Sequence, residues 1–193
     1  DGWNEYESGI LTGKRDVTYY PDVSIWDGEP LNGKHIHIIG EQGIGEEIMF
    51  STMLADMVET GASVSFEVNH RLVPIFSRSF DHVCVVERGR GNDILRTTPK
   101  PKYQISAGEM AKYFRGSIEN FHPKSGFLKP DPERVALIKS RYDDLGTGLK
   151  VGLSWKTSSP VRTELRNIPL TEWSPILELD GCHFISLQYG DNG

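Results

Sequence analysis

Along the chain from residue 35, short apolar runs alternate with segments in which apolar residues recur every three or four positions. The short runs are typical of buried strands, and the second pattern is typical of helices that pack on a sheet. This alternation predicts the α/β class, with a Rossmann-like parallel sheet that carries crossover helices on both faces. The expected strands are 35–39, 63–68, 82–86, 103–106, 149–155 and 183–188, and the expected helices are 44–60, 71–79, 133–145 and 171–179.

The predicted boundary between two domains lies at a short glycine-rich linker, Gly146–Gly148. After it the pattern gives a strand, a helix and a strand, which together start a second β-α-β unit. We therefore expect a first domain over 35–147 and the start of a second, truncated domain over 148–193. The aromatic residues before position 35 follow no clear period, so residues 1–34 are expected to wrap the surface of the first domain.

Composition and charge narrow the classes of partner. Hydrophobic residues make up 37% and charged residues 25% of the chain, which is ordinary for a globular protein. The 27 acidic and 21 basic residues give a net charge of -6, which argues against nonspecific binding to nucleic acid or to an anionic membrane surface. The two cysteines make no disulfide framework, and no apolar stretch approaches the ~18 residues of a membrane span. We therefore expect a cytoplasmic protein with no membrane span and no nucleic-acid partner.

A glycine-rich turn follows the first expected strand, with glycines at positions 40, 43 and 45. Such a turn places the start of the next helix at the carboxyl edge of the sheet, where open α/β folds bind ligands. The glycine spacing is the reverse of the dinucleotide fingerprint, and no Gly-Lys-Ser/Thr follows, so neither nucleotide motif is met. The residues expected to line a cleft here are Glu41, Gln42, Gly43 and Gly45.

The same turn is rich in carboxylates, because it contains Glu41, Glu46 and Glu47. These groups would repel a bound diphosphate, whereas a carboxylate in the first turn of a helix can accept a proton from a hydroxyl. The alternative is that they are ordinary acidic residues of a first helical turn, and the helical pattern does not choose between Glu46 and Glu47. Glu67 ends the second expected strand, near where a dinucleotide domain places its ribose-binding acid. A nicotinamide-dependent oxidoreductase therefore stays open as a less favoured alternative.

A second polar cluster follows the first strand of the second domain. It contains the cations Lys156, Arg162 and Arg166 together with the hydroxyls of Thr157 and Ser158. Cations and hydroxyl donors of this kind can hold a diphosphate through charge-assisted hydrogen bonds. A solvated polar loop explains the same composition equally well.

Two histidines, His35 and His37, share one face of the first expected strand. A zinc site needs three or four ligands, and no further ligand lies at a useful spacing. We interpret both as residues of the sheet and expect no metal site.

Six short motifs, taken in order, resemble the glycosyltransferase-like region that follows tetratricopeptide repeats in many bacterial proteins. They are Trp3–Glu7, Trp26–Leu31 with Gly33-Lys34, Glu41–Gly45, Arg71-Leu72 with Arg78–Phe80, Val151–Trp155, and Ser186–Gln188. That region is similar to the heptosyltransferase family, whose GT-B fold places two Rossmann-like domains on either side of a cleft. The resemblance implies a glycosyltransferase that moves a sugar from a nucleotide-diphosphate sugar to a saccharide or protein acceptor, without a cofactor. It also implies tetratricopeptide repeats upstream, with Trp3–Glu7 as the end of a repeat helix.

The resemblance assigns roles to individual residues. In the heptosyltransferases the first glycine turn ends in Gly-Asp, whose Asp is the proposed base, and here Gly45-Glu46 takes that place. The second domain of that family has a basic residue followed by x-x-Pro-x-x-x-Trp, a spacing that Arg166 meets with Pro169 and Trp173. Arg166 is therefore the expected ligand of the donor diphosphate. The residues expected to assist it are Lys156, Thr157, Ser158 and Arg162.

The alternative from another class is a non-catalytic binding module fused to tetratricopeptide repeats. The feature that favours it is Glu46, which has one methylene more than the aspartate of the family. The expected second domain ends soon after it begins, so we expect the 193-residue chain itself to be inactive and the intact protein to carry any transfer.

Overall fold

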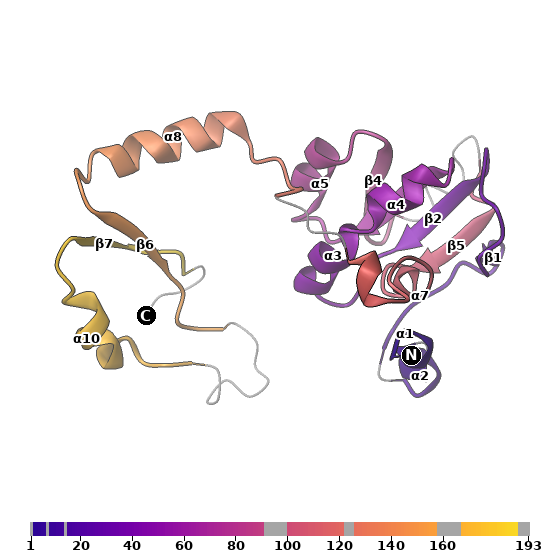
Figure 1. Ribbon diagram of the computed structural model, residues 1–193, viewed down its shortest axis with the longest axis horizontal. Coiled ribbons are helices and arrows are strands. Elements are labelled where there is room, and N and C mark those ends of the chain that lie inside the picture. Colours follow the sequence, from indigo (N-terminus) through magenta and orange to yellow (C-terminus); the bar gives the residue numbers. More distant parts are fainter. Residues whose placement is uncertain are drawn as a thin grey trace. The chain divides into compact units, whose positions relative to one another are not determined.

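The computed structural model describes residues 2–6, 8–13, 15–90, 100–121, 126–157 and 167–188. It separates into two compact units, residues 1–130 and residues 131–193 (Figure 1). The division lies before the helix that follows Asp131, whereas the glycine linker predicted from the sequence lies after that helix. Each unit is described by itself.

In the described residues the first unit contains a five-stranded sheet in which every neighbouring pair of strands is parallel. In spatial order the strands are β1 (Ser24–Ile25), β5 (Tyr103–Ser106), β2 (His35–Ile39), β3 (Ser63–Val68) and β4 (Val83–Glu87). The helices are α1 (Gly2–Tyr6), α2 (Ser8–Leu11), α3 (Ile44–Ser51), α4 (Leu54–Glu59), α5 (Val73–Ser79), α7 (Met110–Phe114) and the 3-10 helix η1 (Ile118–Asn120). Parallel strands joined through helices confirm the predicted α/β class and its Rossmann-like sheet.

The strand order creates a switch point between β2 and β5. From β2 the chain moves outward through β3 to β4, and it then returns to the other side of β2 to form β5. In open α/β sheets, ligands bind in the crevice outside the carboxyl ends of the strands at such a switch point. The residues that follow β2 and β5, beginning at Gly40 and Ala107, therefore lie where a ligand crevice is expected.

The two faces of the sheet differ in chemistry because side chains alternate along each strand. On one face Ile36, Ile38 and Phe66 are fully buried and form one apolar cluster with side chains of α3, α4, α5 and α7. The opposite face carries the buried polar residues His35, His37, Ser65, Glu67 and Gln104. Segment Arg15–Val23 covers this polar face through hydrogen bonds and a ring contact. The expectation of helices on both faces therefore holds for one face in the part of the chain described.

The predicted helix over 44–60 is divided into α3 and α4. The hydroxyl of Ser51 donates to the carbonyl of Ile48, and the hydroxyl of Thr52 donates to that of Met49, both at 2.7 Å. Side-chain bonds of this kind compete with the helical backbone ladder and often bend it. The strands predicted at 35–39, 63–68 and 103–106 have the observed bounds.

The second unit pairs two parallel strands, β6 (Leu149–Leu153) and β7 (Cys182–Ser186). The 3-10 helix η2 (Leu170–Trp173) and α10 (Ser174–Leu177) lie between them in sequence. The unit begins with α8 (Pro132–Asp143), whose first turn is capped by Asp131 through hydrogen bonds from the backbone N–H groups of residues 133 and 134. No residue of α8 is buried, so its apolar side chains contribute to no core in the described residues.

In the ranges that the structure describes, no helix has the length and apolar character needed to cross a bilayer.

Candidate functional site

Glu41 joins the two strand ends at the switch point. It follows β2, its side chain is 1% exposed, and Oε1 accepts a hydrogen bond from the backbone N–H of Gly108, after β5, at 2.7 Å. Nη2 of Arg15 donates to the same oxygen at 2.7 Å and to Oγ of Ser106 at 3.2 Å. Burial raises the pKa of Glu41 above its usual value, although the Gly108 N–H and the Arg15 charge favour its ionised form.

Arg15 is held in this crevice by an aromatic ring as well as by charge. Its guanidinium carbon lies 3.9 Å from the centroid of the Tyr6 ring, and Nη1 donates to the carbonyl of Tyr6 at 3.3 Å. Burial and the nearby Glu41 carboxylate raise the pKa of Tyr6 to about 12. The Arg15 side chain is only 9% exposed, and Nε has no hydrogen-bond partner among the described residues.

The glycine turn after β2 needs glycine at one position in particular. A Cβ at Gly40 would overlap the backbone carbonyl of Glu67 and the carboxylate of Glu47. At Gly45 a Cβ would meet nothing within 4 Å. Gly40 therefore permits β2 to end directly against β3, whereas Gly45 makes no such close approach.

The two glutamates that open α3 have opposite surroundings. Glu47 is fully buried, accepts from the backbone N–H of Asn69 at 3.0 Å, and pairs with the guanidinium of Arg88. Burial raises the pKa of Glu47, while Asn69 and Arg88 favour the anion. Glu46 is exposed, and its Oε2 accepts from the backbone N–H of Gly43 at 3.0 Å. The structure thus separates two residues that the helical pattern left equivalent.

Glu67, at the carboxyl end of β3, anchors a chain of hydrogen bonds. Its carboxylate accepts from the hydroxyl of Tyr20 at 2.7 Å, from the backbone N–H of Gly89 at 3.1 Å, and lies 3.4 Å from Nε2 of His37. Burial opposes ionisation of Glu67, but these hydrogen bonds outweigh it and lower its pKa. Nδ1 of His37 lies 2.9 Å from Oγ of Ser65, as does Nε2 of His35. Both histidines are therefore residues of the sheet, and the described residues hold no group of three or more metal-ligating side chains.

Residues Arg15–Tyr20, here termed the strap, run along this edge of the sheet. The strap contacts the ends of three strands: Arg15 reaches β2 and β5, and Tyr20 reaches β3. Between them the hydroxyl of Tyr19 donates to Glu109, whose carboxylate also accepts from Ser106 Oγ at 2.7 Å. The lead-in was expected only to wrap the surface, and its part in the site was missed.

Beside the strap lies a pocket of about 380 Å³. This volume is at the lower end of the ~300–1,000 Å³ typical of small-molecule sites. Its walls are Asp16, Val17, Thr18, Tyr20, Ile39, Gly40, Glu67, Arg88 and Gly89. The pocket therefore joins the strap to the ends of β2, β3 and β4.

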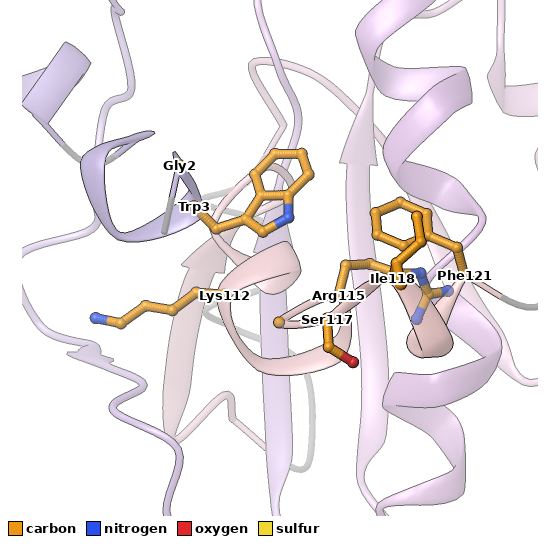
Figure 2. Close-up of a pocket in the computed structure, with 8 residues that line it drawn as sticks. Gly2, Trp3, Lys112, Arg115, Ser117, Ile118 and Phe121 are labelled. Carbon is orange, nitrogen blue, oxygen red and sulfur yellow. The ribbon is translucent and has the colours of Figure 1, made fainter.

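A different pocket, of about 270 Å³, lies among α1, α7 and η1. Figure 2 shows Trp3 of α1 on one side and Ile118 and Phe121 on the other, with Lys112 pointing away. Arg115 lines it, but its guanidinium is bound to Asp56 at 2.7 Å and to a backbone carbonyl. This pocket is away from the strand ends and presents little free polar chemistry.

The start of the predicted donor site is ordered by Gln188. Its Oε1 accepts from the backbone N–H of Trp155 at 3.1 Å and of Lys156 at 3.0 Å, and its Nε2 donates to the carbonyl of Lys156 at 2.9 Å. The N–H of Thr157 donates to Oδ1 of Asn167 at 2.7 Å, and the Lys156 side chain is exposed. The other predicted donor residues, Ser158, Arg162 and Arg166, lie outside the described residues.

Among the proteins compared, the chain is similar to Protein FlbA of Caulobacter vibrioides. The two are 35% identical over 208 residues, which cover 99% of this chain and 34% of that protein. The chain therefore spans about a third of the length of the relative it matches. No family model and no solved structure matches the chain.

Proposed function

We propose that the intact protein is a glycosyltransferase that moves a sugar from a nucleotide-diphosphate sugar to an acceptor hydroxyl. The first unit would be the acceptor-side lobe of a GT-B fold, and the second unit would begin the donor-binding lobe. One observation carries this proposal: of the three glutamates in the turn, only Glu46 is exposed. Glu41 and Glu47 are buried and paired with arginines, so Glu46 is the carboxylate that a substrate can reach.

The surroundings of Glu46 suit a general base. It stands in the first turn of α3, where the helix dipole favours an anion. Oε2 is oriented by the N–H of Gly43, while Oε1 accepts no hydrogen bond from the described residues. That oxygen would take the proton of the acceptor hydroxyl as it attacks the anomeric carbon. Arg166, aided by Lys156 and Arg162, would neutralise the departing diphosphate.

The test uses the intact protein, with transfer measured from nucleotide-diphosphate sugars. Glu46→Gln and Arg166→Ala should each slow transfer by about 10²-fold or more, the loss typical of a missing base or charge stabiliser. Glu59→Gln is the matched control, because Glu59 is exposed on α4 and should leave the rate unchanged. Near-normal rates in both test variants would refute the assignment.

One observation favours the alternative, a non-catalytic binding module attached to tetratricopeptide repeats. The bond from Gly43 to Glu46 is half of a capping box, which explains a glutamate here without any reaction. A binding module would show no preference among uridine, guanosine and adenosine diphosphate sugars. Nucleotide titrations of the intact protein therefore separate the two functions.

A further inference from the structure

Among the described residues, the pocket beside the strap has no free cation for an anionic ligand. Arg88, the cation in the described lining, already donates to the Glu47 carboxylate and to the carbonyl of Glu41. The buried anion of the pocket, Glu67, already receives three hydrogen bonds, and Asp16 is exposed to water. In the described lining a phosphate would meet two carboxylates and no free cation, so an anionic ligand is disfavoured.

The walls suit a neutral ligand that alternates hydroxyl and C–H surface. Tyr20 lines the pocket and donates its proton to Glu67, so its hydroxyl oxygen is left to act as an acceptor toward a ligand. Thr18 adds a hydroxyl and Asp16 a carboxylate, and Val17 and Ile39 add apolar surface. Small-molecule sites usually have walls of this kind, in which a few precisely placed polar groups stand among apolar surface.

The polar wall is also rigid before any ligand arrives. The Glu67 side chain is 7% exposed and is fixed by Tyr20, His37 and the backbone of Gly89. The rings of Tyr20 and His37 pack edge to face, with centroids 5.5 Å apart. Groups held in place in this way lose little conformational entropy on binding, which favours affinity.

We propose that this pocket binds a neutral pyranose ring, with Tyr20, Thr18 and Asp16 hydrogen-bonding its hydroxyls and Val17 and Ile39 against its C–H face. Its role as the acceptor subsite rests on the proposed function, but binding of the ring does not. Glu67 is a positioning residue, because it orients the Tyr20 hydroxyl.

The experiment is a titration of the ¹⁵N-labelled 193-residue chain, followed by NMR, with methyl glucopyranoside, methyl galactopyranoside and N-acetylglucosamine as separate probes. At least one probe should shift the amide signals of Thr18, Tyr20 and Gly89 in a saturable manner. Tyr20→Phe and Asp16→Asn should each weaken that binding about three- to tenfold, the effect expected from one lost hydrogen bond.

Controls and contrary outcomes separate this proposal from the transferase assignment. Asp22→Asn and Tyr142→Phe, the same substitutions outside the pocket, should bind as the wild type does. The inference is overturned if no probe shifts these amides, if both pocket variants bind normally, or if inorganic phosphate alone shifts Gly89. Because the titration needs no donor, Glu46→Gln should still bind the pyranoside, even where it abolishes transfer.

Discussion

Glu41, Glu47 and Glu67 are buried carboxylates at one edge of the same sheet, yet their pKa values move in opposite directions. Burial dominates at Glu41 and Glu47 and raises their pKa. Burial is also the largest influence at Glu67, but three combined hydrogen bonds exceed it and lower the pKa. The direction of each pKa shift therefore depends on how many hydrogen bonds the carboxylate accepts, and the local sequence does not show this number.

Removal of Arg15 should lower the free energy of unfolding, because the buried Glu41 carboxylate loses its paired cation. Arg15→Ala leaves an almost fully buried carboxylate without its cation, and the free energy of unfolding should fall by about 3–5 kcal/mol at pH 7. Urea denaturation measures the change. Arg90→Ala is the control, because Arg90 is 69% exposed in its pair with Glu87 and should cost less than about 0.5 kcal/mol. Equal midpoints for the two variants would contradict the importance of the Arg15 pair.

The opposed pKa shifts predict opposed pH dependences. The raised pKa of Glu47 gives stability that is complete below 4.5 and is lost as pH rises through the folded-state value. Glu47→Gln should therefore gain stability relative to the wild type as pH rises above 4.5, and Arg88, 40% exposed, remains hydrated.

The lowered pKa of Glu67 gives stability that is present above 4.5 and is lost as pH falls through the folded value. The free energy of unfolding of Glu67→Gln should therefore fall relative to that of the wild type as pH rises to 4.5. Denaturation at several pH values tests both, and slopes of one sign would contradict the assignment.

At the level of residues, the sequence indicated the glycine turn and its glutamates but not their partners. Arg15 lies 26 positions from Glu41, and Tyr20 lies 47 positions from Glu67. Such pairs leave no periodic signal in a single sequence. Arg166, on which the predicted donor site depends, lies outside the described residues and stays a prediction.

At the level of elements, two glycines of one turn should respond oppositely to the same substitution. Gly40→Ala would force Cβ against the backbone of β3 and should destabilise the protein by about 1–3 kcal/mol or more. Gly45→Ala has open space within α3 and should stabilise it by about 0.5–1 kcal/mol. Thermal denaturation of the pair provides the measurement. A stabilising Gly40→Ala would show that β2 does not end against β3 as described.

The sequence predicted the strands at the centre of the sheet well, but it missed the shortest strand and the break in the longest predicted helix. The central strand β2 has the predicted bounds because its three isoleucines are closely spaced and a glycine follows them. Strand β1 has two residues, Ser24–Ile25, which are too few to show alternation, and it was missed. The division between α3 and α4 depends on two hydroxyls that donate to backbone carbonyls. A hydrophobic pattern does not show which carbonyl a hydroxyl will bind.

At the level of the whole molecule, every residue of the hydrophobic core cluster belongs to the first unit. Residues 1–130 should therefore fold without the rest, with a cooperative thermal transition close to that of the 193-residue chain. The second unit offers a two-stranded sheet and a helix that exposes Val135, Leu137 and Ile138, so residues 131–193 alone should not unfold cooperatively. Circular dichroism of the two fragments measures this, and a cooperative transition in the shorter one would contradict it.

The strap and β1 have a consequence for the order in which the molecule is assembled. Residues 15–26 are made before β5, and the partner of the Tyr20 backbone, Gln104, lies 84 positions later. Until β5 has emerged, the backbone groups of Tyr20 and Trp26 lack their partner Gln104, although Glu67 is already available to the Tyr20 hydroxyl, and closing so long a loop delays full docking. Full docking of the strap, which forms one wall of the pocket, therefore waits for β5, although the strap is synthesised before the strands of the sheet.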